Sequence, residues 1–400
     1  MKTYSLTLRS ILMLTLSVAF VACKGNKESN NETAIDETAD NTEETAPQST
    51  TNLPLDRLNL PEGFSIDVYA ENLEGARSMA MGADGTLFVG TRNEGKVYAV
   101  KDTDGDYKVD ENYTIASDLE QPNGLAFRDG ALYVAAVSRL FKYPDIESQL
   151  ENPQEPELIY DDYPTEFHHG WKYIAFGPDN KLYVPVGAPC NICDRTDEDE
   201  RFGTITRMDA DGGNREIVAR GVRNTVGFTW HPETDELWFT DNGRDMMGDD
   251  VPPGELNKLT EVGEHFGYPF CHGGTVKDPE FGDQHPCSDF VPPVQPLDAH
   301  VAALGIKFGK GPMFPEAYQG QAFLAEHGSW NRSSKVGYRV TLVKLENGEA
   351  VSYEPFIDGW LDEESQEAFG RPVDLLFLED GSLLISDDEG NAIYRVTYKG

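Results

Sequence analysis

The chain has 400 residues, with 33 Lys or Arg against 70 Asp or Glu, which gives a formal net charge of −37 at pH 7. Hydrophobic residues make up 39% and aromatic residues 10%, as in a globular protein and unlike a disordered one. The acidic balance argues against a nucleic-acid partner and against docking on anionic lipid, because both need clustered basic side chains.

Residues 1–22 have the pattern of a lipoprotein signal peptide. Two basic residues precede an apolar stretch, Ile11 to Ala22, that is too short to span a bilayer as a helix. The ending Val21-Ala22-Cys23 resembles a bacterial lipobox, which implies cleavage before Cys23 and lipidation of its thiol. A plain secretory signal is the alternative. We expect residues 23–52 to be a lipidated Cys with a disordered acidic tether, and the protein to face the periplasm or surface of the bacterial envelope, held by lipid alone.

One pattern recurs through residues 53–400, namely a short apolar strand, a turn of the Asp-Gly type and a second strand rich in β-branched and aromatic residues. This is the strongest short-range signal of a β-hairpin. The six copies span Met79–Val89, Leu125–Val134, Ile174–Val184, Phe228–Phe239, Ile306–Leu324 and Leu375–Ile385. Their second strands open 45, 50, 55, 86 and 60 residues apart, which fits four-stranded blades with an insertion between copies four and five. The sequence therefore predicts an all-β domain, a six-bladed β-propeller over residues 53–400.

Propeller geometry places the residues just before each first strand at one mouth of the central channel. The polar residues at this level in blades two to six are Gln121, His169, Arg223-Asn224, His300 and Arg371, and blade one offers Arg77. Loops are polar in any fold, but His is scarce here, with 8 in the chain. A ring of cationic side chains in an acidic chain predicts an anion-binding site.

An acidic segment follows the first repeat and contains Asp102, Asp104, Asp106 and Asp110. Its alternating carboxylates resemble a calcium loop, although Gly105 comes earlier than the invariant glycine of an EF-hand. Two interpretations remain open, a structural calcium site and a solvated acidic turn.

Four cysteines remain in residues 53–400, and an oxidising envelope compartment favours two disulfides. We expect the pairs Cys190–Cys193 and Cys271–Cys287. A redox dithiol or half a zinc site is the alternative for Cys190-Asn-Ile-Cys193. A c-type haem attachment is excluded, because Asp194 rather than His follows.

Four segments, each beside an expected blade strand, carry a family resemblance: His169 to Asp179, Gly221 to Asn224, His327 to Arg332, and Gly370 to Asp374. On these residues the chain resembles the soluble glucose/sorbosone dehydrogenase family over about residues 60–398. The sorbosone dehydrogenase branch is the closer fit, because of the third segment and the Asp249-Asp250 pair. The resemblance implies a six-bladed propeller that binds pyrroloquinoline quinone (PQQ) and usually calcium. It also implies oxidation of an aldose, aldosone or related aldehyde, with a cytochrome or quinone as electron acceptor.

The resemblance also implies roles for single residues. His169 matches the family's general base, which removes a hydroxyl proton while a hydride passes to the quinone. PQQ is a tricarboxylate, and arginine pairs best with carboxylates, so the residues expected to hold it are Arg223, Arg332 and Arg371, with Asn224 as a neutral donor. The family's calcium ligands are two backbone carbonyls, which map to Gly243 and Arg244. Candidates for the substrate pocket are Gln121, His300 and Trp330.

One departure from the family concerns the support of the base. Glucose-oxidising relatives carry an Asp shortly after the strand of blade three, where this chain has Gly187-Ala188-Pro189.

Two other functions compete with the dehydrogenase interpretation. A metal-dependent propeller lactonase needs several carboxylates converging in the channel, and a non-catalytic carbohydrate-binding propeller predicts a broken set of site residues.

Overall fold

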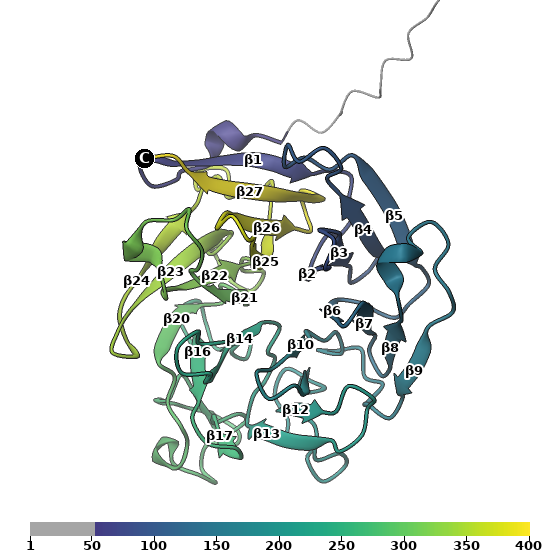
Figure 1. Ribbon diagram of the computed structural model, residues 1–400. Coiled ribbons are helices and arrows are strands. Elements are labelled where there is room, and N and C mark those ends of the chain that lie inside the picture. Colours follow the sequence, from purple (N-terminus) through teal and green to yellow (C-terminus); the bar gives the residue numbers. More distant parts are fainter. Residues whose placement is uncertain (1–52) are drawn as a thin grey trace, which may run out of the picture. The chain divides into compact units, whose positions relative to one another are not determined.

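The computed structural model describes residues 53–400, so the expected signal peptide, Cys23 and the tether lie outside the described residues. Six antiparallel sheets surround a central axis, and the prediction of a six-bladed β-propeller is confirmed (Figure 1). The helices in this part of the chain are single 3-10 turns: η1 (Leu55–Arg57), η2 (Ile146–Ser148), η3 (Cys287–Asp289) and η4 (Glu316–Tyr318). None of the helices in residues 53–400 could cross a membrane.

Blades one to three follow the chain from the axis outward. Blade one consists of β2 (Met79–Met81), β3 (Leu87–Gly90), β4 (Val97–Lys101) and β5 (Glu111–Ala116). Blade two consists of β6 (Gly124–Arg128), β7 (Ala131–Ala135), β8 (Leu140–Tyr143) and β9 (Glu157–Tyr160). Blade three consists of β10 (Ala175–Phe176), β11 (Leu182–Val186), β12 (Thr204–Met208) and β13 (Glu216–Arg220), with β17 (Glu264–His265) added in parallel to its outer edge.

Blades four to six complete the ring. Blade four consists of β14 (Phe228–Trp230), β15 (Leu237–Asp241), β16 (Pro253–Leu259) and β20 (Gln295–Ala299). Blade five consists of β21 (Ala303–Phe308), β22 (Ala322–Glu326), β23 (Arg339–Glu346) and β24 (Glu349–Ile357). Blade six consists of β25 (Pro372–Phe377), β26 (Leu383–Asp387), β27 (Ala392–Tyr398) and β1 (Phe64–Ala70).

The ring is closed by strands from the two ends of the described chain. β1 pairs antiparallel with β27, from Phe64 opposite Tyr398 to Ala70 opposite Ile393, and so forms the outer strand of blade six (Figure 1). This pairing was not predicted, because the sequence analysis began blade one at Met79 and assigned no partner to residues 64–70. It links strands more than 300 residues apart, and therefore holds the first and last blades together.

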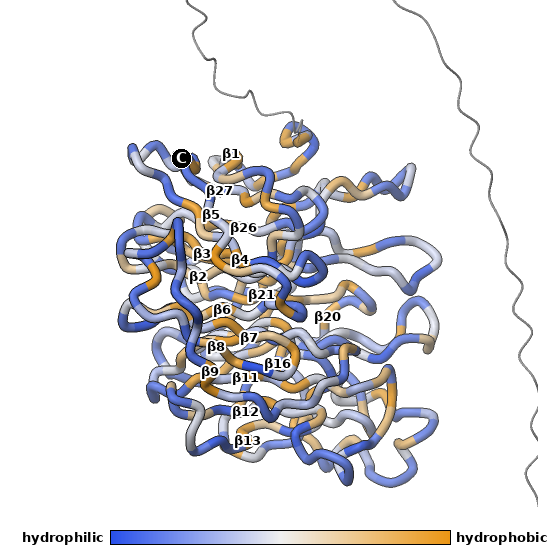
Figure 2. Tube along the Cα trace, turned by 90° about the vertical axis from the view of Figure 1, so that its right-hand side faces the viewer, coloured by the Kyte–Doolittle hydropathy of each residue, from blue (hydrophilic) through white to orange (hydrophobic). Residues whose placement is uncertain are grey.

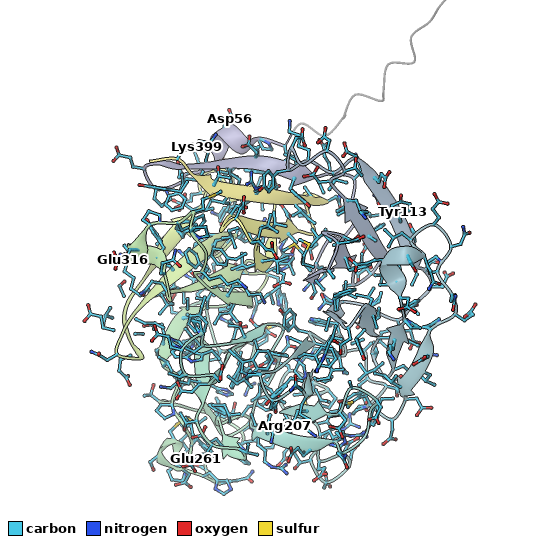
Figure 3. The ribbon with its side chains drawn as sticks, in the orientation of Figure 1. Asp56, Tyr113, Arg207, Glu261, Glu316 and Lys399 are labelled. Atoms are coloured by element: carbon cyan, nitrogen blue, oxygen red, sulfur yellow. A yellow bond between two sulfur atoms is a disulfide. The ribbon has the colours of Figure 1, made fainter. Side chains whose placement is uncertain are left out.

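Apolar side chains fill the spaces between neighbouring blades. Figure 2 shows the apolar segments concentrated in the strands and the polar ones in the loops. Trp238 of β15 and Phe308 of β21 meet edge to face between blades four and five, with ring centres 5.5 Å apart. Polar side chains such as Glu261 and Glu316 lie at the outer edge of the ring (Figure 3).

The insertion between β16 and β20 reaches from blade four to blade three. Its strand β17 joins blade three, and the hairpin β18 (Cys271–His272) with β19 (Val276–Lys277) follows. The structure contains both expected disulfides, Cys271–Cys287 within this insertion and Cys190–Cys193 in the loop between β11 and β12. The hydroxyl of Tyr268 in the insertion accepts from the Cys193 N–H at 3.0 Å, so the insertion contacts the β11–β12 loop.

Candidate functional site

A cavity of about 400 Å³ opens at one end of the ring. It lies where the innermost strands begin and the second strands end, since an antiparallel hairpin brings these two ends together. Five blades contribute its main side chains, which are Arg77, Arg92, His168, His169, Trp171, Arg223, Asn224, Asn242, Asp245, His300, His327, Trp330 and Arg371. Its size is within the range of small-molecule sites.

Most of the residues predicted for the channel mouth meet in this cavity. They are Arg77, His169, Arg223, Asn224, His300 and Arg371, and Trp330 and the backbone of Gly243 join them. Trp330 is 69% exposed, so it belongs to the rim rather than to the core. Three arginines of the expected ring therefore share one site with His169 and His300.

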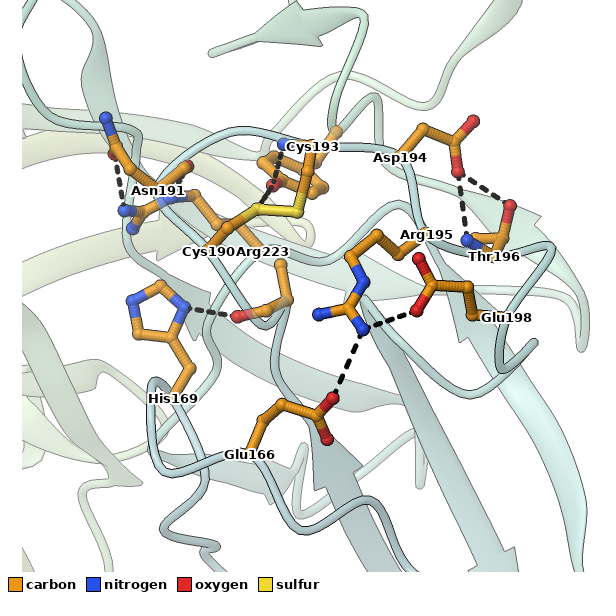
Figure 4. Close-up of a disulfide and its surroundings, with 12 residues drawn as sticks. Glu166, His169, Cys190, Asn191, Cys193, Asp194, Arg195, Thr196, Glu198 and Arg223 are labelled. Carbon is orange, nitrogen blue, oxygen red and sulfur yellow. Dashed lines mark hydrogen bonds and ion pairs between the residues drawn. A yellow bond between two sulfur atoms is a disulfide. The ribbon is translucent and has the colours of Figure 1, made fainter. Parts of the chain in front are cut away.

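His169 is held as a neutral imidazole with one free nitrogen. It is buried in the loop between β9 and β10, and its Nδ1 lies 2.8 Å from the carbonyl oxygen of Ala188 (Figure 4). Because a carbonyl only accepts, Nδ1 carries the proton and Nε2 keeps its lone pair. Burial, followed by the charge of Arg223, holds the pKa of His169 well below its usual 6.5. Its Nε2 bonds to no side chain in residues 53–400 and can accept a proton.

Arg223 is buried and almost fully engaged by the protein. Its Nε and Nη2 donate to the carbonyl and Oδ1 oxygens of Asn191 at 2.8 and 2.9 Å, and Nη1 donates to the carbonyl of Asn242 at 3.0 Å. Its Nη2 also pairs with Asp245 at 3.2 Å. One N–H of the guanidinium is left for a ligand. Arg223 can therefore donate one hydrogen bond to a carboxylate but cannot bind it through two.

Two other arginines in the cavity have guanidinium groups without a carboxylate of the described chain in direct contact, although the charges of Asp388 and Glu94 act on Arg92 from further away. Within residues 53–400, neither Arg92 nor Arg371 forms an ion pair; Arg371 donates instead to the carbonyls of His327 and Gly328 at 3.0 and 2.9 Å. Arg92 lies over the ring of Trp171, 3.7 Å from its centre, and its Nε is buried without a hydrogen-bond partner. Burial lowers the pKa of Arg92 to about 10, so it stays protonated at neutral pH.

Another histidine that lines the cavity, His327, is paired with a carboxylate. The Nε2 of His327 lies 2.7 Å from Asp388, and Asp388 also pairs with the buried Arg77. Burial lowers the pKa of His327 to about 4 despite this carboxylate. Among residues 53–400, Asp388 and Asp245 thus pair with Arg77 and Arg223, whereas Arg92 and Arg371 line the cavity without an ion pair.

The structure places two predicted residues outside the cavity wall. Arg332 pairs with Asp250 at 3.0 Å and also donates to the carbonyl of Asp249, which explains the acidic pair noted in the sequence. Gln121 lies in a left-handed turn with φ of 50°, and blade two contributes Asn123 at this level instead. Asn123 accepts a hydrogen bond of 2.8 Å from the Nε of Arg77, so it positions that arginine.

The residues proposed for calcium fall into two separate places. Gly243 lines the cavity, whereas the Arg244 side chain points to Asp278 at 2.6 Å; neither of their carbonyls accepts a hydrogen bond within residues 53–400. At the outer side of blade one, the carboxylates of Asp102, Asp104 and Asp106 lie within 4.8 Å of one another. Asp110 does not join them, because it accepts from the backbone and hydroxyl of Thr103.

Four residues that line the cavity had no role predicted from the sequence: Arg92, Asn242, Asp245 and His327. They share one position, in the loop just after the second strand of a blade. In an antiparallel hairpin this loop lies beside the start of the first strand. The same hairpin pattern that located His169 and Arg371 could therefore have identified them.

Comparisons with known proteins bear on the family and the fold. The family model described as Glucose / Sorbosone dehydrogenase matches residues 135–329, and a TrAA12-like model matches residues 274–399. The chain belongs to the glucose/sorbosone dehydrogenase family. An uncharacterized protein of Borreliella burgdorferi is 36% identical over 356 residues, covering 86% of this chain and 91% of that protein.

Solved structures show the same fold at lower identity. The PQQ domain of pyranose dehydrogenase from Coprinopsis cinerea, in its holo form, has a TM-score of 0.72 at 18% identity, covering 88% of this chain and 98% of that one. A carbohydrate-active enzyme of family AA12 from Trichoderma reesei has a TM-score of 0.71 at 22% identity, covering 86% and 98%. The PQQ-bound aldose sugar dehydrogenase from Streptomyces coelicolor has a TM-score of 0.61 at 20% identity, covering 85% and 100%.

Proposed function

We propose that this protein is a PQQ-dependent dehydrogenase that oxidises an aldose, an aldosone of the sorbosone type or a related aldehyde. One observation carries the proposal: a single cavity combines unpaired cations with a buried imidazole whose Nε2 is free to accept a proton. Family membership supports the dehydrogenase class, and PQQ-binding relatives with this fold support the cofactor. Attachment to the bacterial envelope through Cys23, and electron transfer to a cytochrome or quinone, are parts of the same proposal.

The residues of the cavity fit a tricarboxylate. Within residues 53–400, Arg92 and Arg371 offer guanidinium groups that form no ion pair, and Arg223 and Asn224 add further hydrogen-bond donors. The buried Nε of Arg92 has no partner in residues 53–400, which is the state expected of a donor kept for a ligand. The free carbonyls of Gly243 and Arg244 are oxygen donors of the kind that calcium prefers. When bound, PQQ supplies an electron-poor quinone that accepts a hydride.

The protein's own part in the reaction is proton transfer and orientation. His169 accepts the substrate's hydroxyl proton at Nε2, while the Ala188 carbonyl keeps Nδ1 protonated and the ring oriented. His300 donates Nε2–H to the carbonyl of Gly248 at 2.8 Å, so its Nδ1 is an acceptor for a sugar hydroxyl. Trp330 offers an exposed aromatic face at the rim, on which a sugar ring can stack.

The cavity offers little to the lactonase alternative. Among residues 53–400, Asp245 is the only acidic residue that lines the cavity, and its carboxylate pairs with Arg223. A catalytic metal held by several carboxylates has no ligand set there.

The test is a titration of the purified, calcium-loaded protein with PQQ, followed by dye reduction with a panel of aldoses and aldosones. We expect saturable binding and sugar-dependent reduction. His169→Gln should abolish turnover and leave the Kd for PQQ nearly unchanged, because the base does not hold the cofactor. Folded protein that binds no PQQ in the presence of calcium would refute the proposal and favour a non-catalytic propeller.

A further inference from the structure

The loop between β11 and β12 makes contacts that the proposed function does not account for. The Cys190–Cys193 disulfide bridges two positions within this loop, and both cysteines are half-buried beside the cavity (Figure 4). The two side chains that matter most to the cavity, His169 and Arg223, both bond to it. No other loop in residues 53–400 binds both of them.

Asn191, between the two cysteines, uses both its backbone and its side chain on the cavity wall. Its carbonyl and Oδ1 accept from Nε and Nη2 of Arg223 at 2.8 and 2.9 Å. Its Oδ1 also accepts from the backbone N–H of Asp245 at 2.7 Å, and its Nδ2 donates to the carbonyl of Asp245 at 3.2 Å. One residue thus fixes both members of the Arg223–Asp245 ion pair.

The same loop fixes His169 from two sides. The Ala188 carbonyl holds Nδ1, and the Ala188 N–H donates to the carbonyl of Arg223 at 2.8 Å, so the histidine and arginine contacts are linked through one peptide unit. Beyond the disulfide, Arg195 donates to Glu166 at 3.3 Å, which lies in the segment that leads to His169. A shift of the loop would move both side chains together.

Packing alone does not hold the loop in place. A cavity of about 230 Å³ lies behind it, lined by Ala188, Cys193, Phe202, Tyr268 and other residues. The loop has no tightly packed partner on the side of this pocket, so covalent and polar contacts restrain it there. The disulfide supplies one restraint, and the Tyr268 hydroxyl, which accepts from the Cys193 N–H at 3.0 Å, supplies the other.

We infer that the segment 188–193, which contains the Cys190–Cys193 disulfide, is the positioning element of this cavity, in which Asn191 orients Arg223 and the Ala188 carbonyl sets the tautomer of His169. Reduction by a dithiol would break the sulfur–sulfur bond, take up two electrons and two protons to give two thiols, and leave the reductant as a disulfide. The segment then loses its covalent restraint next to this pocket. The site therefore depends on the oxidised state of Cys190 and Cys193 without their taking part in the reaction.

The first arm of the test rests on the proposed function and measures the Kd for PQQ. It compares Asn191→Gly with the matched control Asn180→Gly in the β10–β11 turn of the same blade. Asn180 accepts from Arg128 through its carbonyl and Oδ1, both at 3.0 Å, which is the geometry of Asn191 and Arg223 away from the cavity. We expect Asn191→Gly to weaken binding about tenfold or more, the usual effect of losing a hydrogen bond to a charged group, while the control binds like the wild type.

The second arm needs no cofactor. It measures the tautomer of the His169 imidazole by 15N NMR, and His169→Gln identifies the signals of this ring. We expect the Nδ1–H tautomer in the wild type and a shift toward the Nε2–H tautomer in Cys190→Ser/Cys193→Ser. Should that variant fail to fold, the same spectrum of wild-type protein treated with dithiothreitol replaces it. Folding is monitored by the thermal unfolding of each variant.

The outcomes separate the inference from the proposed function. If the wild type binds no PQQ but the His169 tautomer depends on the disulfide, the proposed function is wrong and the inference stands. If the wild type binds PQQ and the two Asn variants bind equally well, the inference is overturned and the proposed function stands. An unchanged His169 tautomer overturns the inference in either case.

Discussion

A single methyl group added at Gly187 tests whether the position of His169 controls activity. A Cβ at Gly187 would lie 2.5 Å from the Cβ of His169 and 2.8 Å from its carbonyl oxygen. Ordinary carbon contacts are about 3.5 Å, so His169 would have to move by about 1 Å. A displacement of this size can lower a rate by about 100-fold, or about 2.7 kcal/mol. We therefore expect Gly187→Ala to reduce kcat/KM by about two orders of magnitude.

The assay is PQQ-dependent dye reduction with an active sugar, together with thermal unfolding. The control is Gly213→Ala in the β12–β13 turn of the same blade, where the nearest contact of the new Cβ is the Oδ1 of the flexible Asp211 side chain at 3.1 Å. It should leave activity unchanged. Overpacking at Gly187 also costs about 1–3 kcal/mol of stability, so turnover is compared at a temperature where both variants are folded. Wild-type kcat/KM in folded Gly187→Ala would refute the reasoning.

Two further predictions concern the cofactor and the second disulfide. Arg371→Ala should weaken PQQ binding by about 1.5–3 kcal/mol, because a charged donor without a protein carboxylate is removed; unchanged affinity in a titration would exclude Arg371 from the cofactor site. Cys271→Ser/Cys287→Ser should lower the free energy of unfolding by about 3 kcal/mol in a urea titration, because this bridge closes a loop with a sequence separation of 16; a change below about 1 kcal/mol would contradict that account.

The propeller could be predicted because each blade carries a local signal. Asp129 and Gly130, for example, both have positive φ, at 50° and 78°, which is the conformation that an Asp-Gly hairpin turn favours. The closing pair β1–β27 could not be predicted in the same way, because its partners are distant in the chain and no turn joins them. The parallel addition of β17 to blade three is likewise a long-range contact without a local pattern.

The site could be predicted in position more than in detail. His169, Arg223 and Arg371 followed from their place before a first strand, and the structure brings them to one cavity. Spacing could not show that Asn191 would already engage Arg223, since the two are brought together only by the packing of blade three against blade four. Nor could it show that the Ala188 carbonyl supports His169, because a backbone oxygen leaves no trace in residue identity.

The charges that would attract an anionic cofactor also keep the proposed base neutral. After burial, Arg223 is the largest cause that lowers the pKa of His169, and His168 and Arg92 add to it; the hydrogen bond to the Ala188 carbonyl raises this pKa but does not reverse the shift. A bound tricarboxylate would offset the two arginines, so the pKa of His169 should be higher in the PQQ-loaded protein than in the free protein. An NMR titration of the His169 ring with and without PQQ measures this. A pKa that stays the same or falls on loading would show that the cofactor's carboxylates do not sit near these arginines, and would move PQQ to another part of the cavity.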